Sequence, residues 1–277
     1  MEETRARITR EGIRIYEDAD FAGMAKAGQV AAEILDLVAP LVRPGATTGA
    51  IDDFIREEIA RRGVTSATTG YKGYQHASCI SVNHVVCHGI PGAKVLADGD
   101  ILNVDVTVIV DGWYGDTSRM YVAGALPRKA ERLIEVTHEA LMRGIAEVKP
   151  GNTFGDIGHA IQSYAEANRM SVVRDFCGHG LGRVFHAPPN VLHYGRPGTG
   201  VELEPGMIFT VEPMVNIGRR DIKEMPDGWT IVTKDRSLSA QWEHTVLVTP
   251  TGYEVLTLSA GAPAIPDFVQ GVAHAAA

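Results

Sequence analysis

Several features that would assign a chain to a particular class of protein are missing from this sequence. No run of residues approaches the ~20 apolar positions that span a bilayer. The formal net charge of -8 argues against binding to duplex nucleic acid, which needs a basic face. The N-terminal stretch MEETRARITREG is charged throughout and lacks the apolar segment of a secretory signal. We therefore expect a cytoplasmic protein without a membrane or duplex nucleic-acid partner.

Cysteine is scarce as well. The three cysteines, Cys79, Cys87 and Cys177, form no CxxC pair, which argues against a disulfide framework and against a thiolate zinc site. We interpret them as reduced thiols in buried positions. No GxSxG nucleophile elbow, HExxH motif or P-loop is present, and GHGLG lacks the spacing of the dinucleotide fingerprint.

What the sequence does contain is an internal repeat within 277 residues of ordinary globular composition. The segment LVRPGATTGAIDDFI from Leu41 matches EVKPGNTFGDIGHAI from Glu147 at an offset of 106 residues. LADGDILNVDV from Leu96 matches LEPGMIFTVEP from Leu203 at an offset of 107. We therefore expect one domain over 1-277, with two related halves at about 20-125 and 126-258, a short N-terminal extension and a C-terminal tail.

Each half is predicted to contain two helices followed by strands. Apolar residues at helical spacing predict helices around 24-35 and 51-59 in the first half, and around 133-145 and 157-165 in the second. Threonine precedes the second helix of each half at positions 47 and 153, where an N-cap belongs.

The segment ILNVDVTVIV predicts a strand with an acidic residue on one face. Its valines alternate with Asp105 and Thr107, so one face is apolar and the other polar. Asp111-Gly112 is a strong hairpin signal, and pairing across it places Thr107 opposite Asp116. Asp105 and Asp116 are then diagonal neighbours on one face, roughly 7 to 8 Å apart.

Two carboxylates placed in this way repel each other and raise one another's pKa unless a cation neutralises them. A solvated acidic hairpin explains the same two residues, so further ligands are needed to decide. Three candidates lie in apolar or glycine-rich segments: His179 in GHGLG, Glu212 in FTVEPMV and Glu243 in SAQWEHT. Each alone is more often a structural or solvent-facing residue. Under the repeat offset, however, Glu212 corresponds to Asp105.

These five residues, in the settings NVDVTV, GDTS, CGHGLGRVFH, VEPM and SAQWEHT, closely resemble the type I methionine aminopeptidases. The resemblance extends from about Phe21 to Leu258. It implies a single catalytic domain with the pita-bread fold, a pseudo-twofold α/β (α+β) arrangement in which helices flank a central, largely antiparallel sheet.

The resemblance also implies a dinuclear metal site. Asp105 would bind one ion, His179 and Glu212 the other, and Asp116 and Glu243 both. Such a hard, oxygen-rich donor set suits two divalent ions, Co, Mn, Fe(II) or Zn, and ligand type alone does not choose among them. Two such ions lower the pKa of a shared water, and the family assigns the acid matching Glu212 as a candidate general base.

Two histidines and an aromatic pocket are implied for the substrate. His88 in CHGIPG and His186 in VFHAPP match positions that contact the amide nitrogen and the carbonyl oxygen of the scissile bond. Thr68 and Lys72 depart from a common bacterial pattern, in which Cys and His occupy these positions. The implied substrate-binding residues, for each of which core packing is the alternative, are Tyr71, Tyr74, Cys79, Phe185 and Trp229, together with both histidines.

The resemblance therefore implies a metal-dependent aminopeptidase. Its expected substrates are nascent polypeptide N-termini that carry methionine before a small second residue. We expect a monomer, with any contact to the ribosome surface made by the catalytic body. The alternatives are an Xaa-Pro peptidase-like hydrolase of the same fold and a non-catalytic binding protein of that fold. A type II enzyme is disfavoured because only 33 positions separate His179 from Glu212.

Overall fold

The structure is a computed structural model that describes residues 7-258. The first six residues and residues 259-277, which include the expected C-terminal tail, lie outside the described part of the chain. No helix in the described part is both long and apolar enough to cross a bilayer. The helices are α1 (Asp18–Val38), α2 (Thr48–Arg61), α3 (Arg128–Ala146) and α4 (Phe154–Ala167), with short 3-10 turns η1 (Ala39–Leu41) and η2 (Tyr71–Gly73).

All four predicted helices are confirmed, and so are the threonines before two of them. The Thr47 hydroxyl accepts a hydrogen bond from the Ala50 backbone N–H at the start of α2. At the start of α4, Thr153 and Asp156 form a capping box, in which the Asp156 carboxylate accepts from the Thr153 backbone N–H at 2.7 Å. Such caps satisfy N–H groups that have no partner within the helix.

The strands of the first half centre on one long hairpin. Strands β6 (Asp100–Val110) and β7 (Trp113–Ala123) pair in the predicted register, with Thr107 opposite Asp116. The other members of this sheet are β3 (Thr65–Ser66) and β4 (Cys79–Val82), which both pair with β6. A third segment of the first half, β5 (Val85–Cys87), pairs instead with β14 (Ile231–Thr233) of the second half, beside β13 (Ile222–Glu224).

The second half contributes a five-stranded sheet in the order β10-β9-β11-β16-β17 and a three-stranded sheet in the order β15-β12-β8. Every strand pair recorded between residues 7 and 258 is antiparallel. The predicted central sheet is thus divided into several hydrogen-bonded sheets. The bounds are β1 (Arg7–Ile8), β2 (Arg14–Ile15), β8 (Ser171–Val172), β9 (Gly178–Gly180), β10 (Ala187–Val191), β11 (Ile208–Val211), β12 (Met214–Asn216), β15 (Ser239–Gln241), β16 (His244–Thr249) and β17 (Gly252–Val255).

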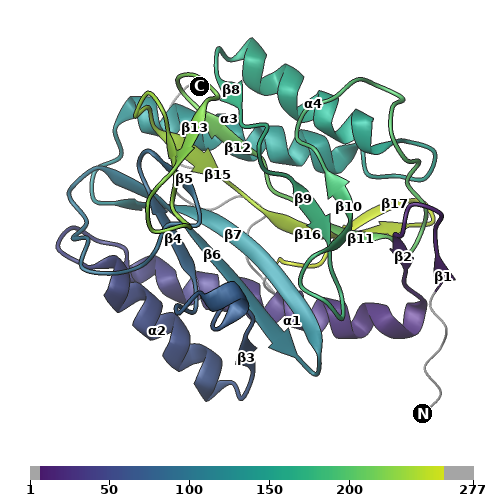
Figure 1. The fold of residues 1–277 in the computed structure, drawn as a ribbon, viewed down its shortest axis with the longest axis horizontal. Coiled ribbons are helices and arrows are strands. Elements are labelled where there is room, and N and C mark those ends of the chain that lie inside the picture. The colour runs from purple at the N-terminus through teal and green to yellow at the C-terminus, as the bar shows by residue number, and fades with distance from the viewer. Residues whose placement is uncertain (1–6, 259–277) are drawn as a thin grey trace, which may run out of the picture.

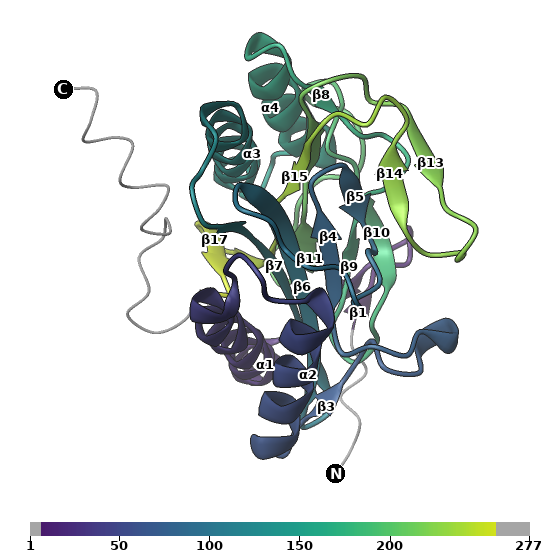
Figure 2. The same ribbon diagram turned by 90° about the vertical axis from the view of Figure 1, so that its left-hand side faces the viewer.

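In the view of Figure 1, the strands lie between the α1–α2 pair and the α3–α4 pair. In the view turned by 90°, the helices lie on one side of the strand layer (Figure 2). The apolar face of β6 packs on α1 in one buried cluster, which includes Val104, Val106 and Leu35. A second cluster joins α3 and α4 to β11, for example through Ile134, Ile161 and Phe209. Each pair of helices therefore has its own buried core, as expected for a repeat.

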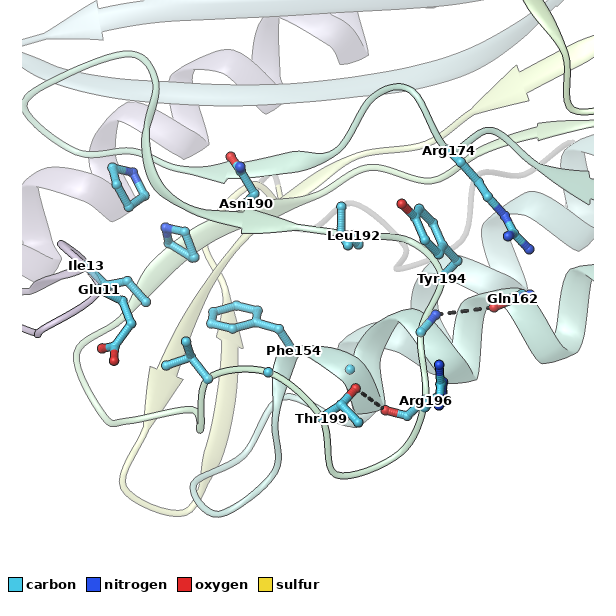
Figure 3. A pocket seen from close by; sticks show the side chains of 16 residues that line it. Glu11, Ile13, Phe154, Gln162, Arg174, Asn190, Leu192, Tyr194, Arg196 and Thr199 are labelled. Atoms are coloured by element: carbon cyan, nitrogen blue, oxygen red, sulfur yellow. Dashed lines mark hydrogen bonds between the residues drawn. The ribbon is translucent and has the colours of Figure 1, made fainter.

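The sheets of the two halves meet at the centre of the molecule. Ser118 of β7 forms a β-bridge with Glu243, and the Thr117 hydroxyl donates to the Glu243 carbonyl at 2.7 Å. A cavity of about 550 Å³ opens at this junction. A second cavity, of about 820 Å³, lies beside α4 (Figure 3).

Candidate metal centre

The β6–β7 hairpin places two carboxylates on the face that points away from α1. Val104 and Val106 are fully buried on the α1 side, so strand alternation turns Asp105 and Thr107 to the opposite side. The Thr107 hydroxyl donates to the Asp116 carboxylate at 2.7 Å. This bond holds one carboxylate oxygen of Asp116 and leaves the other directed toward the second half of the chain.

The second half supplies three further donors from neighbouring strands. His179 lies on β9, Glu212 directly follows β11, and Glu243 directly precedes β16. Strand β11 pairs with both β9 and β16, which brings these three residues to one region of the sheet. The bridge between Ser118 and Glu243 then joins this region to the β6–β7 hairpin.

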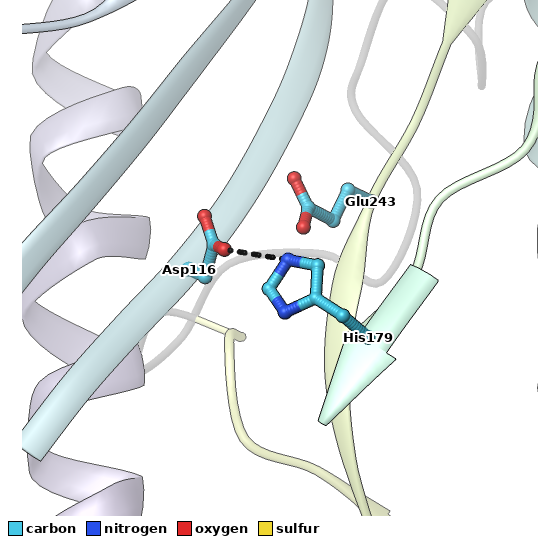
Figure 4. A group of neighbouring side chains, drawn as sticks. All are labelled: Asp116, His179 and Glu243. Carbon is cyan, nitrogen blue, oxygen red and sulfur yellow. Dashed lines mark ion pairs between the residues drawn. The ribbon is translucent and has the colours of Figure 1, made fainter. Parts of the chain in front are cut away.

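The donors converge on one point. One donor atom from each of Asp116, His179 and Glu243 lies within 4.8 Å of the other two (Figure 4). His179 Nε2 lies 3.5 Å from Asp116 Oδ2 and 3.7 Å from Glu212 Oε1. Asp105 lines the same cavity as the other four residues. The structure thus brings all five predicted ligands together.

The electrostatics of this cluster are unfavourable without a cation. Burial raises the pKa of each of the four carboxyl groups above its usual range. Repulsion from Asp116 raises the pKa of Asp105 and of Glu243 further. Removing one ion from water costs several kcal/mol, so several buried carboxylates need protons or cations nearby.

The local hydrogen bonds fit a cation as the missing partner. Asp105 Oδ1 is buried and has no hydrogen-bond partner within the described residues. His179 Nδ1 lies 3.1 Å from the Gly180 carbonyl, which assigns the proton to Nδ1 and leaves the Nε2 lone pair facing Asp116 and Glu212. A divalent cation would bind the unpaired carboxylate oxygen of Asp105 and the Nε2 lone pair of His179.

Two residues that support the ligands were missed in the sequence. The Thr210 hydroxyl donates to Glu212 Oε1 at 2.7 Å, and the Gln241 amide donates to Glu212 Oε2 at 3.3 Å. Thr210 precedes Glu212 by two positions, as Gln241 precedes Glu243, and residues two apart share a strand face. This periodicity could have identified both.

A third supporting residue carries no such signal. His193 is fully buried, and its Nε2 accepts a hydrogen bond from the Glu212 backbone N–H at 3.0 Å. Burial lowers the pKa of His193 to about 3, so the ring is neutral at pH 7. Because β10 and the segment after it approach Glu212 only in the folded chain, the sequence could not reveal this contact.

Both expected catalytic histidines line the cavity at the junction. His88 has a left-handed backbone conformation, with φ of 55°, which is uncommon for a residue other than glycine. Burial lowers its pKa. Burial, with repulsion from His179, lowers the pKa of His186 to about 3. Both rings are therefore uncharged at neutral pH.

The expected substrate-binding residues also line this cavity. The Tyr74 ring packs against Trp229, and the Tyr71 ring packs against Phe185, each at 4.9 Å between centroids. The Tyr71 hydroxyl lies 3.1 Å from His186 Nδ1. Cys79 is buried, as predicted. All three cysteines lie in the cavity wall and are free. Cys177 is only partly buried, so the expectation of a buried position was wrong for it.

The two positions that depart from the bacterial pattern lie in the wall as well. Thr68 is buried, and its hydroxyl donates to the His76 carbonyl at 2.9 Å. Lys72 is exposed, and its Nζ lies 5.3 Å from the centroid of the Tyr71 ring. Thr68 thus has a structural bond of its own, whereas Lys72 places a positive charge beside the pocket.

Comparison with known proteins agrees with this geometry. Residues 22–250 match the sequence profile of metallopeptidase family M24. The chain is 54% identical to the methionine aminopeptidase of Rickettsia prowazekii over 89% of this chain and 96% of that protein. It is 52% identical to the methionine aminopeptidase of Escherichia coli, over 89% and 94% of the two chains.

The crystal structure of the Rickettsia prowazekii enzyme superposes with a TM-score of 0.88 and covers 89% of this chain and all of that one. The match therefore includes both halves and the junction between them. The chain belongs to metallopeptidase family M24 and, within it, to the methionine aminopeptidases.

Proposed function

We propose that the chain removes the N-terminal methionine from nascent polypeptides with a small second residue, using two divalent cations held by Asp105, Asp116, His179, Glu212 and Glu243. The observation that carries this proposal is the convergence of these five side chains at the wall of a cavity lined by aromatic rings. Bound cations supply a water of lowered pKa and stabilise negative charge on the amide carbonyl oxygen.

The side chains around the cluster are suited to proton transfer. Glu212 lines the cavity beside the other predicted ligands, so its carboxylate would be placed to accept the proton of the attacking water. Thr210 and Gln241 hold both of its oxygens and fix its orientation. His88 and His186 are neutral, so each offers one N–H and one lone pair to the scissile amide without adding charge.

The cavity wall favours an unbranched thioether. Tyr74, Trp229 and Phe185 present aromatic surfaces, and contacts between sulfur and aromatic rings are favourable. The Tyr74 hydroxyl donates to the Ser78 carbonyl at 2.9 Å, which fixes the ring. We therefore expect this wall to accept the linear side chain of methionine more readily than a branched one.

Metal analysis combined with peptide hydrolysis tests the proposal. The purified protein loaded anaerobically with one ion at a time, Co, Mn, Fe(II) or Zn, should release methionine from Met-Ala-Ser and bind two ions per chain. The matched peptide Val-Ala-Ser should remain intact. A protein that binds ions but cleaves no peptide would support the non-catalytic alternative.

An Xaa-Pro substrate separates the remaining enzyme alternative. Preferential cleavage of Ala-Pro over Met-Ala-Ser would support the Xaa-Pro peptidase-like alternative. The cytoplasmic location, the monomeric state and a contact with the ribosome surface stay predictions.

A further inference from the structure

The larger of the two cavities lies outside the cluster of ligands. It is a groove of about 820 Å³ between the β1–β2 hairpin, β10 and α4, which we call the α4 groove (Figure 3). Its apolar surface includes Ile13, Phe154, Pro189 and Val201. Leu192 is 39% exposed there, although large apolar side chains are usually buried.

The α4 groove and the cavity that holds the ligands share part of their lining. Pro188 and Asn190 line both cavities. In the β9–β10 register, Asn190 lies directly opposite the predicted ligand His179. Only β10 therefore separates the metal centre from the groove, and neighbouring strands lie about 4.8 Å apart.

The edge of β10 favours a peptide that crosses the strand over a peptide that pairs along it. β10 is the outermost strand of its sheet, and an unpaired edge normally offers N–H groups to an added strand. Pro188 and Pro189 have no N–H and so weaken pairing there. Crossing two strand spacings covers about 10 Å, or about three extended residues. A peptide cleaved at the metal centre would thus reach the groove near its fifth residue.

The far end of the groove is positively charged. Arg174 stacks on Tyr194 at 4.8 Å and lies 3.7 Å from Glu166. Arg196 lines the same end and has no ion-pair partner in the part of the chain that the structure describes. Glu11 lies at the opposite end (Figure 3). The groove thus offers an apolar surface that ends in an arginine without a carboxylate.

We propose that the α4 groove binds the substrate polypeptide downstream of the residues at the metal centre, and that Arg196 favours an acidic side chain there. This inference rests on the proposed function, because it names a further binding site for the same substrate. The groove would bind the downstream peptide equally well before and during bond cleavage. Its occupation should therefore lower KM and leave kcat unchanged.

Peptides of different length test the inference. The acidic decapeptide Met-Ala-Ser-Gly-Leu-Glu-Leu-Glu-Ser-Gly should have a kcat/KM roughly tenfold above that of Met-Ala-Ser, through a lower KM. A counterpart with Lys in place of both Glu residues should have a kcat/KM about threefold below that of the acidic decapeptide. This difference should be larger at low salt than at high salt.

Variants assign the effect to the groove. Arg196→Glu should reverse the preference between the acidic and basic decapeptides, and Leu192→Ser should reduce the gain with length for both. Neither should change turnover of Met-Ala-Ser. Arg128→Glu is the matched control, because Arg128 is exposed on α3 and does not line the groove. This control variant should cleave all three peptides with the kcat/KM of the native protein.

Equal kcat/KM for the tripeptide and both decapeptides would overturn the inference and leave the proposed function intact. An acidic preference retained in Arg196→Glu would overturn the role of Arg196. If no peptide is cleaved, the proposed function fails. In that case, binding of a fluorescently labelled acidic decapeptide to the native protein and to Arg196→Glu decides for or against the groove.

Discussion

At the scale of single residues, Asp105 shows how a strand can carry a ligand at a cost in stability. It sits in β6 between two fully buried valines, and one of its oxygens is buried without a hydrogen-bond partner in the described chain. Such a group usually destabilises a fold by about 1–3 kcal/mol or more. Because Asp105 faces the second half of the molecule, its carboxylate can contribute to the metal site that the two halves form.

His88 is the residue whose removal should separate chemistry from metal binding. His88→Ala should lower kcat by about 10²-fold to 10⁴-fold, the range for a lost proton donor or acceptor, and leave metal content unchanged. Steady-state kinetics and metal analysis on one sample measure both effects. His84→Ala is the control, because His84 lies in the β4–β5 turn, on the other side of β5 from His88, and does not line the cavity. Native turnover in His88→Ala would remove His88 from the mechanism.

At the scale of elements, Asp52 connects α2 to the wall of the substrate cavity. Its buried carboxylate accepts hydrogen bonds from the Ala77 and Ser78 backbone N–H groups and from the Ser78 hydroxyl, at 2.7 to 2.9 Å. The segment held in this way leads directly into Cys79. Its carbonyl at Ser78 also accepts from the Tyr74 hydroxyl.

We expect Asp52→Ala to lower the free energy of unfolding by about 3 kcal/mol, because several bonds to a charged group are lost and two backbone donors are left without a partner. KM for Met-Ala-Ser should rise as the wall loosens. Urea denaturation and kinetics measure these changes. Asp53→Ala removes an exposed carboxylate one position along α2 and should change little. Equal stability of the two variants would contradict the role of Asp52.

The packing of α1 on β7 depends on a glycine. A Cβ atom at Gly115 would lie 2.1 Å from the Ala27 carbonyl oxygen, so the two backbones approach closely. Gly115→Ala should therefore lower the free energy of unfolding by about 1–3 kcal/mol. Gly252→Ala is the control, since nothing lies within 4 Å of a Cβ there. Thermal or urea denaturation that places both variants at native stability would show that α1 can shift without cost.

At the scale of the whole molecule, the cluster of carboxyl groups makes stability depend on metal and pH together. A carboxyl with a raised pKa in the fold holds a proton that the unfolded chain has lost. The metal-free fold therefore loses stability as the pH rises from about 4 through these raised pKa values, whereas the metal-bound fold does not. His193 and His244 have lowered pKa values. Their effect on stability is the same in the metal-free and the metal-bound fold, so it cancels when the two are compared.

The difference in unfolding temperature between metal-loaded and chelated protein should thus be larger at pH 8 than at pH 6. At a free metal concentration about 100 times Kd, the loaded form gains about 2.7 kcal/mol. Differential scanning calorimetry with and without chelator, at both pH values, checks this. A difference that does not vary with pH would show that the carboxyl groups hold no protons in the metal-free fold.

Much of the local structure could be predicted because its signals are periodic. The spacing of apolar residues predicted all four helices. The alternation around Asp105 and the turn at Asp111-Gly112 predicted the register that places Thr107 opposite Asp116. The repeat placed acids at matching positions of both halves. The family context identified five residues that line one cavity.

Other features were decided by tertiary structure alone. The approach of His193 to Glu212, the bridge between Ser118 and Glu243, and the groove beside α4 join segments far apart in the sequence. Periodicity within a strand or helix follows from how each backbone directs its own side chains, so the sequence by itself determines which residues share a face. Which faces meet depends on how distant strands pair and pack, and only the folded chain determines that.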